Sequence, residues 1–534
     1  MMLSIALLGL IWENGAAVPA GRAYPAGFAG FFKTDISWDW LPVAYGATAV
    51  GVTRTNYWYD ISGNAWQTRA QGPTPARYDC AGTFATLSGE KQLFVFAGSA
   101  GSYPAGNTAF RYRYSTNAWT QIANFPYQAE GVMAAGEIAG MIYTFGGHNA
   151  PGSLTPPTVT TNTYRYSPSG NSYTVRTAMP VARSEAGCAI ARNENGDSCI
   201  YIISGIYSFD GFTGEPYYTS RTDEYNPGSN SWRNRANFPG TPVSGASAAT
   251  LRNKIYVMGG YNYWSGANPT AIYIYNPATN TWVSGAAHTP SVPDLPGGRD
   301  GGVATAPDFP LQRVNLIRPV NGDTCCNDTI FWRRGTGAVK IVFATGGDAA
   351  NNVYTTTWRL RSVVQGYVLK YDTLPNLATA SVVWNDMDGS GTDDRDTTQT
   401  LLSLTLLEDH WYYWTVGVVD DMPDTAWSAD TFRFYYDCEP AHEGAVESPG
   451  HIKPSLENVL APGPVVLLTF VTPLSGIYSL RIYDSGGRLA LARELGAEQG
   501  RNGLPVWLPG PGVYMAIIEG QGISEKARVV ITGR

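Results

Sequence analysis

One short stretch of this 534-residue chain places oxygen-bearing groups at alternate positions. Calcium binds six to eight hard oxygen ligands, and calcium loops supply them from alternate residues with a glycine at the sixth position. The alternate positions here hold Asp386, Asp388, Ser390, the main-chain carbonyl of Thr392, and Asp394. Gly391 is sixth, but Thr397 stands where an EF-hand has a glutamate, and no helices are expected beside the loop. We therefore predict a structural calcium site that is not an EF-hand; an acidic loop solvated by water is the alternative.

Motifs of the common enzymatic chemistries are missing. The chain has no Gly-x-Ser-x-Gly elbow, no glycine-rich phosphate loop and no His-Glu-x-x-His sequence. Only five histidines occur, which disfavours a histidine-rich metal centre. The N-terminal half offers acidic residues for a glycosidase pair, but the required separation is a spatial property: Asp35, Asp39, Glu130, Glu137 and Glu185. We therefore expect a protein that is not an enzyme.

The composition indicates short strands joined by tight turns. Charged residues are 15% of the chain, aromatic residues are 13%, and there are 60 glycines and 35 prolines. Long helices would need far more Ala, Glu, Lys and Arg. The net charge is −7, and no run of five basic residues occurs. An all-β protein is expected, and a nucleic-acid partner is excluded because such binding needs a basic stripe.

Aromatic residues seven positions apart recur through the first 300 residues. The pairs are Tyr59 and Trp66, Tyr112 and Trp119, Tyr166 and Tyr173, Tyr225 and Trp232, and Tyr275 and Trp282. Apolar stretches that end in small residues, such as Tyr143–Gly147 and Tyr256–Gly260, lie between the pairs. A period near 50 residues with a glycine doublet, a Tyr and a Trp resembles the kelch repeat. The resemblance implies a kelch-like β-propeller over residues 31–306.

The physics of a four-stranded sheet supports this interpretation. Such a sheet cannot bury both faces alone, whereas sheets stacked radially around an axis bury both. The paired aromatic side chains are expected to fill the space between neighbouring sheets. The first unit lacks an innermost strand, and Gly301–Ala306 resembles the innermost strands of the other units. We therefore predict that this late strand completes the first blade and closes a ring of about five blades.

Two long loops of the propeller are rich in aromatic residues. They are Ile206–Ser220 and Tyr261–Pro269, and each follows the second strand of its blade, on the face where blades connect. Their aromatic residues are Tyr207, Phe209, Phe212, Tyr217, Tyr218, Tyr261, Tyr263 and Trp264. With Asp210 and Asn262 nearby, we predict a rim that stacks sugars or anchors a partner protein. Packing of these loops on each other or on a neighbouring domain is the alternative.

The N-terminus begins with an apolar run, Leu3–Trp12, followed by small residues. This pattern predicts a secretory signal over residues 1–20, and a first buried strand is the alternative. Other apolar runs are much shorter than 18 residues, so no transmembrane helix is expected.

A second β-rich region follows the propeller. Seven short strand candidates over residues 313–437 predict a β-sandwich. The stretches Trp411–Asp420 and Ala426–Phe432 resemble the last strands of a fibronectin type III domain. The resemblance implies an immunoglobulin-like stalk module.

Residues 438–464 are rich in Pro, Glu and Gly and are predicted to be a linker to a last domain, residues 465–534. Within that domain, Ser479–Leu489, Gly512–Tyr514 and Lys526–Ile531 resemble the immunoglobulin-like C-terminal sorting domain of type IX secretion cargo. The resemblance implies export to the bacterial cell surface or the extracellular space, with the secretion machinery as a partner.

Together these features predict an exported, non-enzymatic binding protein. The propeller rim is expected to recognise a glycan or an extracellular protein, and the C-terminal modules are expected to act as stalk and sorting signal. Two alternatives remain: a self-associating structural subunit of an extracellular layer or filament, and a carbohydrate-active enzyme of the propeller type.

Overall fold

The computed structural model describes residues 10–23, 40–102, 104–150 and 155–307, and then strands and loops separated by gaps from residue 316 to residue 531. Apart from one 3-10 turn, η1 (Gly285–Ala287), every regular element of these residues is a β-strand. The all-β prediction is therefore confirmed. The chain divides into two compact units, Met1–Cys438 and Glu439–Arg534. Among the described residues, no helix is long and apolar enough to cross a membrane.

The first unit contains a ring of antiparallel sheets, which we call blades. Blade 1 holds β2 (Trp40–Ala44), β5 (Asn56–Asp60) and β6 (Ala65–Arg69). Blade 2 holds β7 (Ala81–Leu87), β8 (Glu90–Phe96), β9 (Ala109–Arg113) and β10 (Ala118–Ile122). Blade 3 holds β11 (Met133–Ile138), β12 (Met141–Phe145), β15 (Thr163–Ser167) and β16 (Ser172–Val175). Blade 4 holds β17 (Gly187–Arg192), β18 (Ser198–Ile203), β21 (Thr222–Asn226) and β22 (Ser231–Arg235). Blade 5 holds β23 (Ser247–Leu251), β24 (Lys254–Met258), β25 (Tyr273–Asn276) and β26 (Thr281–Ser284).

A repeated set of contacts joins each blade to the one before it. In blade 4 the buried Tyr225 hydroxyl donates to Asn230 Oδ1 at 2.8 Å, and this oxygen also accepts the Thr177 N–H of blade 3 at 3.0 Å. Trp232 Nε1 donates to the carbonyl of the same Thr177 at 2.8 Å. Equivalent contacts occur in blades 2 and 5. The prediction that the paired aromatic residues lie between blades is therefore confirmed.

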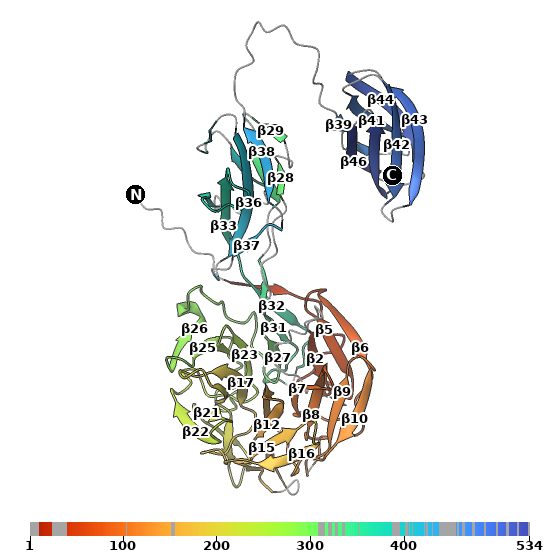
Figure 1. Ribbon diagram of the computed structural model, residues 1–534. Helices are drawn as coiled ribbons and strands as arrows, with labels where there is room; N and C mark the ends of the chain where they lie inside the picture. The colour runs from red at the N-terminus through yellow and green to blue at the C-terminus, as the bar shows by residue number, and fades with distance from the viewer. Residues whose placement is uncertain are drawn as a thin grey trace. The chain divides into compact units, whose positions relative to one another are not determined.

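A sixth blade is assembled from three distant parts of the chain. It contains β27 (Val303–Thr305), β31 (Val339–Ala344), β32 (Thr357–Arg361) and β1 (Ile11–Asn14), in this order outward. Figure 1 shows β27, β31 and β32 between blade 5 and blade 1. The innermost strands β7, β11, β17, β23 and β27 contact one another in turn.

This blade corrects three expectations. The late strand, β27, pairs with β31 and not with blade 1, and the described residues form six blades where five were expected. Residues 339–361, expected in the second domain, form the middle of blade 6, so the propeller extends beyond 31–306. The 50-residue period failed here because this blade is not continuous in sequence. Only the small-residue ending Ala344–Gly347 repeats the signature of the other blades.

The described part of residues 1–20 is folded into this blade. Leu10 is buried, and Ile11–Asn14 pair with β32. Ala16 donates its N–H to Asn64 Oδ1 and accepts from Trp66 Nε1, both at 2.8 Å, as the equivalent residues of the other blades do. The structure therefore agrees with the alternative in that a strand forms here, but β1 is the outer strand of the blade, and of the described residues of the apolar run only Leu10, just before it, is buried. The secretory signal was expected over all of residues 1–20. A ten-residue apolar run fits either interpretation, because both need a short hydrophobic segment.

Two more sheets complete the first unit. One contains β28 (Leu316–Arg318), β30 (Thr329–Arg333) and β35 (Asp396–Thr400). The other contains β29 (Asp323–Cys325), β38 (Phe432–Tyr436), β36 (His410–Asp420), β33 (Val364–Asp372) and β34 (Ser381–Asp386), with β37 (Thr425–Trp427) also paired to β36. Their core includes Trp414 and Tyr367. Since β28, β29 and β30 lie between β27 and β31 in the sequence, part of this region interrupts blade 6.

The second unit consists of two sheets that share one core. The first contains β39 (Ser455–Leu456), β41 (Val465–Thr472) and β44 (Gly500–Trp507). The second contains β40 (Val459–Ala461), β46 (Ile523–Ile531), β45 (Gly512–Gly520), β42 (Gly476–Asp484) and β43 (Leu489–Ala497). Phe470 of one sheet and Ile482 of the other lie in the same core. The strands β39 and β40 lie inside residues 438–464, which were expected to be only a linker.

Candidate functional site

One backbone position close to the propeller axis is unusual. Just before the innermost strand, blades 2 to 6 have a residue with a left-handed backbone: Asp79 (φ 53°), Gly131 (66°), Glu185 (52°), Gly245 (63°) and Gly301 (52°). Backbone hydrogen bonds of 2.9–3.0 Å connect these residues from blade to blade. Glycine adopts this conformation without strain, whereas a residue with a Cβ does so at a cost. Acidic residues at two of these positions therefore suggest a role beyond folding.

These residues open into an axial hollow of about 130 Å³. It is lined by Asp79, Gly131 and Glu185, together with Cys80 and Cys188. Burial raises the pKa of the Cys80 thiol to about 12 and raises that of Cys188 as well, so both thiols are protonated at neutral pH and are weak nucleophiles.

A histidine from blade 3 lies next to the two carboxylates that line the hollow. His148 lies in β13 (His148–Asn149), which pairs with β14 (Thr158–Val159). One ligand atom each from Asp79, His148 and Glu185 lies within 4.8 Å of the others. The imidazole is buried, with Nδ1 2.7 Å from Ser184 Oγ and Nε2 3.3 Å from Glu130 Oε1. Three consecutive blades thus supply one group each.

Enclosure and like charge both act on the two carboxyls. Burial raises the pKa of Asp79 well above its usual value, and the charges of Glu185 and Glu130 raise it further. Burial also raises the pKa of Glu185, an effect that His148 opposes and Glu130 reinforces. The mouth of the hollow therefore favours protons or other positive charge.

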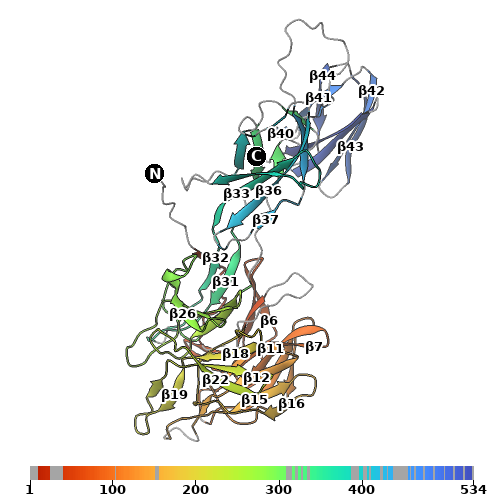
Figure 2. The same ribbon diagram turned by 60° about the vertical axis from the view of Figure 1, so that its left-hand side comes forward.

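The predicted aromatic residues lie on two contacting segments at the same face. One is the hairpin of β19 (Ile206–Phe209) and β20 (Pro216–Tyr218), which lies at the margin of the propeller in Figure 2, and the other is residues 261–264. The exposed fractions are 40% for Tyr207, 100% for Phe212, 38% for Tyr217, 45% for Tyr263 and 54% for Trp264. Phe209, Tyr218 and Tyr261 are half-buried. We call these eight residues the aromatic rim.

Hydrogen bonds hold exposed rings of Tyr263 and Trp264 in the aromatic rim. Trp264 stacks on Tyr217 with ring centroids 6.1 Å apart, and its Nε1 donates to the Pro216 carbonyl at 2.8 Å. The hydroxyl of Tyr263 donates to Glu215 Oε1 at 2.9 Å. The two loops therefore pack on each other, as the alternative expected, yet leave aromatic faces open to solvent.

The rim is continuous with the mouth of the hollow. The Phe209 ring lies 5.0 Å from the His148 ring. The Tyr218 hydroxyl accepts the Tyr263 N–H at 3.2 Å and interacts with Ser244, which also bonds to Glu185. Burial raises the pKa of Tyr218 to about 12, so this hydroxyl stays protonated. Aromatic and carboxylate groups thus form one surface.

Sequence reasoning missed how the mouth is assembled. Glu185 was noted only as one acidic residue among several, and Asp79 was not noted at all. The available signal was their alignment with Gly245 and Gly301, directly before the innermost strands. The calcium positions Asp388, Ser390, Thr392 and Asp394 lie outside the described residues, and Asp386 ends β34 with a side chain that is not described.

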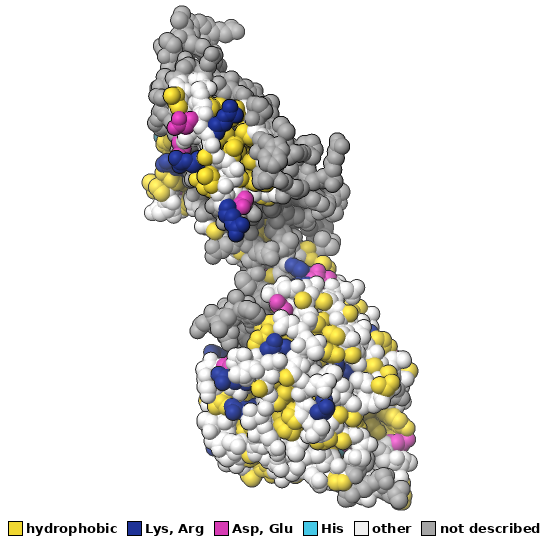
Figure 3. Space-filling model, turned by 90° about the vertical axis from the view of Figure 1, so that its right-hand side faces the viewer, with side chains coloured by type: hydrophobic (Ala, Val, Ile, Leu, Met, Phe, Trp, Pro, Cys, Tyr) yellow, Lys and Arg dark blue, Asp and Glu magenta, His cyan; other side chains and the backbone are white. Residues whose placement is uncertain are grey.

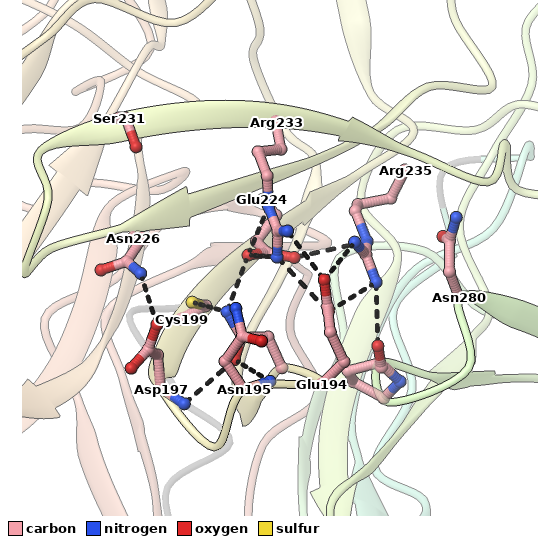
Figure 4. Close-up of polar contacts among 12 residues, drawn as sticks. Glu194, Asn195, Asp197, Cys199, Glu224, Asn226, Ser231, Arg233, Arg235 and Asn280 are labelled. Carbon is pink, nitrogen blue, oxygen red and sulfur yellow. Dashed lines mark hydrogen bonds and ion pairs between the residues drawn. The ribbon is translucent and has the colours of Figure 1, made fainter.

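A second charged cluster lies at the opposite end of blade 4 (Figure 4). Arg233 and Arg235 each pair with both Glu194 and Glu224, at N–O distances between 2.5 and 3.3 Å. Glu224 is fully buried and also accepts from the Tyr201 hydroxyl at 3.2 Å. On the face of the propeller in Figure 3, charged side chains are few and scattered. In the cluster of Glu194, Glu224, Arg233 and Arg235 the charges neutralise one another, so we interpret the cluster as structural.

The ring of sheets and its repeated Tyr–Trp contacts define the class: the chain contains a kelch-repeat β-propeller. The Kelch motif model matches residues 242–287, which include all of blade 5.

The chain is similar in sequence to several curated proteins. N-acetylneuraminate epimerase of Pasteurella multocida (strain Pm70) is 24% identical over 199 residues, which are 31% of this chain and 50% of that protein. Kelch-like protein 23 of Mus musculus is 27% identical over 288 residues, which are 51% of this chain and 43% of that protein. The chain thus spans half or less of the length of these relatives. A solved structure titled "Structure of YjhT" is 15% identical with a TM-score of 0.45, covering 72% of this chain and 99% of that one.

Proposed function

We propose that the protein binds a glycan on the aromatic rim without transforming it. The observation that carries this proposal is the group of exposed aromatic side chains beside a polar hollow, of which Tyr217, Tyr263 and Trp264 are held in place by hydrogen bonds. The C–H faces of sugar rings are apolar and pack on aromatic rings, whereas sugar hydroxyls need polar partners. The rim provides both kinds of group.

Polar acceptors lie next to the exposed rings. Asp210 accepts from the Tyr217 hydroxyl at 3.2 Å, and Glu215 accepts from Tyr263. A carboxylate has about four acceptor sites, so each retains capacity for sugar hydroxyls. This mixture favours a glycan over a protein partner, whose interfaces have an apolar core depleted of charged groups.

The test is a glycan array followed by calorimetry with the best ligand. We expect Trp264→Ala to weaken binding at least tenfold, because it removes half of the Tyr217–Trp264 stack. Trp411→Ala is the matched control, since Trp411 is a 38% exposed tryptophan outside the propeller blades. Equal losses in both variants, or no glycan bound by the wild type, would refute the proposal.

Catalysis on the bound sugar is the second candidate. The observation that favours it is the raised pKa of Asp79 and Glu185, because burial and like charge that raise the pKa of a carboxyl are typical of general acids. Relatives of this chain include proteins named N-acetylneuraminate epimerase. Product analysis of a sugar panel that includes N-acetylneuraminate separates the candidates. Binding without turnover supports the first, and new product that depends on Asp79 supports the second.

We further propose that the C-terminal modules, fibronectin type III-like and sorting-domain-like, keep the protein outside the cell. The resemblance of Ser479–Leu489 and Lys526–Ile531 to sorting domains supports this. Cell fractionation of a strain that expresses the full chain tests it, and retention in the cytoplasm would contradict it. Electron microscopy of the purified protein addresses the structural-subunit alternative, which predicts large ordered assemblies.

A further inference from the structure

The glycan proposal does not use a set of groups that lies beside the hollow at the propeller axis. Asp79, His148 and Glu185 each present one ligand atom, and these atoms lie within 4.8 Å of one another. Two carboxylate oxygens and one imidazole nitrogen are ligands that zinc and related ions accept. We propose that these three residues bind a divalent transition-metal ion, for which zinc is the representative. This proposal goes beyond glycan binding.

The backbone brings the three side chains to one point. Asp79 and Glu185 flank Gly131, to which each is joined by a backbone hydrogen bond of 2.9–3.0 Å. A Cβ placed on Gly131 would lie 2.1 Å from Ser184 Oγ, 3.0 Å from Glu185 Cγ and 3.1 Å from His148 Nδ1. Glu185 and His148 therefore approach each other over Gly131, which has no side chain, and Asp79 joins them there.

The histidine is oriented as a metal ligand would be. Metal-binding histidines use one ring nitrogen and donate the other N–H to a carboxylate or carbonyl. Here Nε2 of His148 lies 3.3 Å from Glu130 Oε1, which favours the tautomer with its proton on Nε2. Nδ1 then carries the lone pair and accepts the hydrogen of the Ser184 hydroxyl at 2.7 Å. A metal ion on Nδ1 would take the place of this hydroxyl, whose hydrogen can turn to the Gly131 carbonyl 3.2 Å away.

The distances and the space are suitable for one ion. Zinc–ligand bonds of about 2.0–2.2 Å place ligand atoms roughly 3.4 Å apart in a tetrahedron, so small side-chain rotations are enough. The hollow of about 130 Å³ has room for an ion and several waters. A divalent ion would also offset the repulsion between the two enclosed carboxyls. Three protein ligands leave a coordination position open toward the hollow.

The experiment uses the full chain, stripped with a chelator and kept in excess calcium, and titrates it with zinc chloride. We expect one zinc ion per chain at this site and a higher melting temperature of the wild type with zinc. Glu185→Gly and Asp79→Gly should each weaken this binding at least a hundredfold. Both variants should fold, because glycine occupies the equivalent positions 131, 245 and 301.

Two further variants and one spectrum complete the test. Glu130→Gln should weaken zinc binding by about 10- to 100-fold, as loss of an outer partner of a histidine ligand does. Asp197→Asn, in the exposed turn between β17 and β18, should leave it unchanged. Cys80 and Cys188 also line the hollow and could compete as ligands, so the spectrum of the cobalt-loaded protein distinguishes the two possibilities. We expect nitrogen and oxygen ligation and no thiolate charge-transfer band.

No zinc bound by the wild type, unchanged affinity in both glycine variants, or a thiolate band from cobalt would each overturn the proposal. The glycan experiment is run separately in chelator. Because no metal is bound in chelator, the effect of Trp264→Ala on glycan binding tests the aromatic rim independently of the metal site.

Discussion

Asp79 and Glu185 occupy the same backbone position in blades 2 and 4, on either side of Gly131, and both have a left-handed backbone. The three equivalent positions in blades 3, 5 and 6 hold glycine, so the fold requires a left-handed backbone there but no side chain. The two acidic residues therefore combine backbone strain with enclosed like charges, at the mouth of the axial hollow.

Replacing Glu185 with glycine should stabilise the metal-free protein. Relief of the left-handed backbone strain contributes about 1–2 kcal/mol, and the greater entropy of unfolded glycine removes about 0.5–1 kcal/mol of that. Chemical denaturation in chelator should give a higher midpoint for Glu185→Gly. A lower midpoint would show that the carboxylate contributes more to folding than the strain costs. Glu130→Gln, which changes charge without relieving backbone strain, is the control.

Asn230 tests the contact that joins blades 3 and 4. Its φ is 53°, and its Oδ1 accepts hydrogen bonds from Tyr225 and Thr177. Asn230→Ala loses both the hydrogen bonds and a residue suited to this backbone, so we expect a loss of about 2–4 kcal/mol. Asn230→Gly keeps the backbone conformation and should lose less. If thermal melts give the two variants equal stability, the backbone conformation is not part of the effect.

Two neighbouring residues test whether the N-terminal strand closes the ring. Leu10 is 2% exposed in the core of blades 5 and 6, whereas Ile11 is 50% exposed. Leu10→Asp should destabilise the protein by more than about 3 kcal/mol, because it buries an unpaired charge. Ile11→Asp should change stability by less than about 0.5 kcal/mol. Similar unfolding midpoints for both variants would argue against β1 as the outer strand of blade 6.

His288 should make stability depend on pH. Burial is the largest effect and lowers the pKa of His288 below 6.5. The hydrogen bond from Nδ1 to the Pro290 carbonyl raises this pKa, whereas the charge of Lys254, whose Nζ lies 3.0 Å from Nε2, lowers it. The unfolded chain therefore binds a proton more readily, so stability is complete above pH 7 and falls as the pH drops through 6.5. Melting curves of His288→Gln between pH 7 and pH 5 should show a weaker dependence than the wild type. Parallel curves would exclude this histidine as the cause.

The calcium loop remains a prediction from sequence. Calcium should raise the melting temperature of the wild type, because a bound ion stabilises the folded state. Asp388→Ala removes one of the expected ligands and should abolish the rise. A wild type that melts at the same temperature in saturating calcium and in chelator would eliminate the site.

Much of the propeller was predictable because its signals are local. Tyr225 and Trp232 are seven residues apart, and their turn asparagine lies between them, so one repeat contains most of the groups that make its contact with the preceding blade. The aromatic rim was predictable for a similar reason, since loops after the second strands of adjacent blades emerge on one face. The sequence did not predict which rim residues are exposed, because this depends on how the two loops pack: Trp264 is open to solvent, whereas Tyr218 is half-buried.

The sequence by itself determined the all-β class, the repeat and the residues between blades, because these depend on neighbours within about 50 residues. Only the tertiary structure decided that Ile11–Asn14 complete a blade with residues 303–305 and 339–361, and that Asp79, His148 and Glu185 meet near the axis. Ring closure joins segments hundreds of residues apart, and an axis collects single residues from separate blades. Neither leaves a local period, so packing of the whole ring had to bring these groups together.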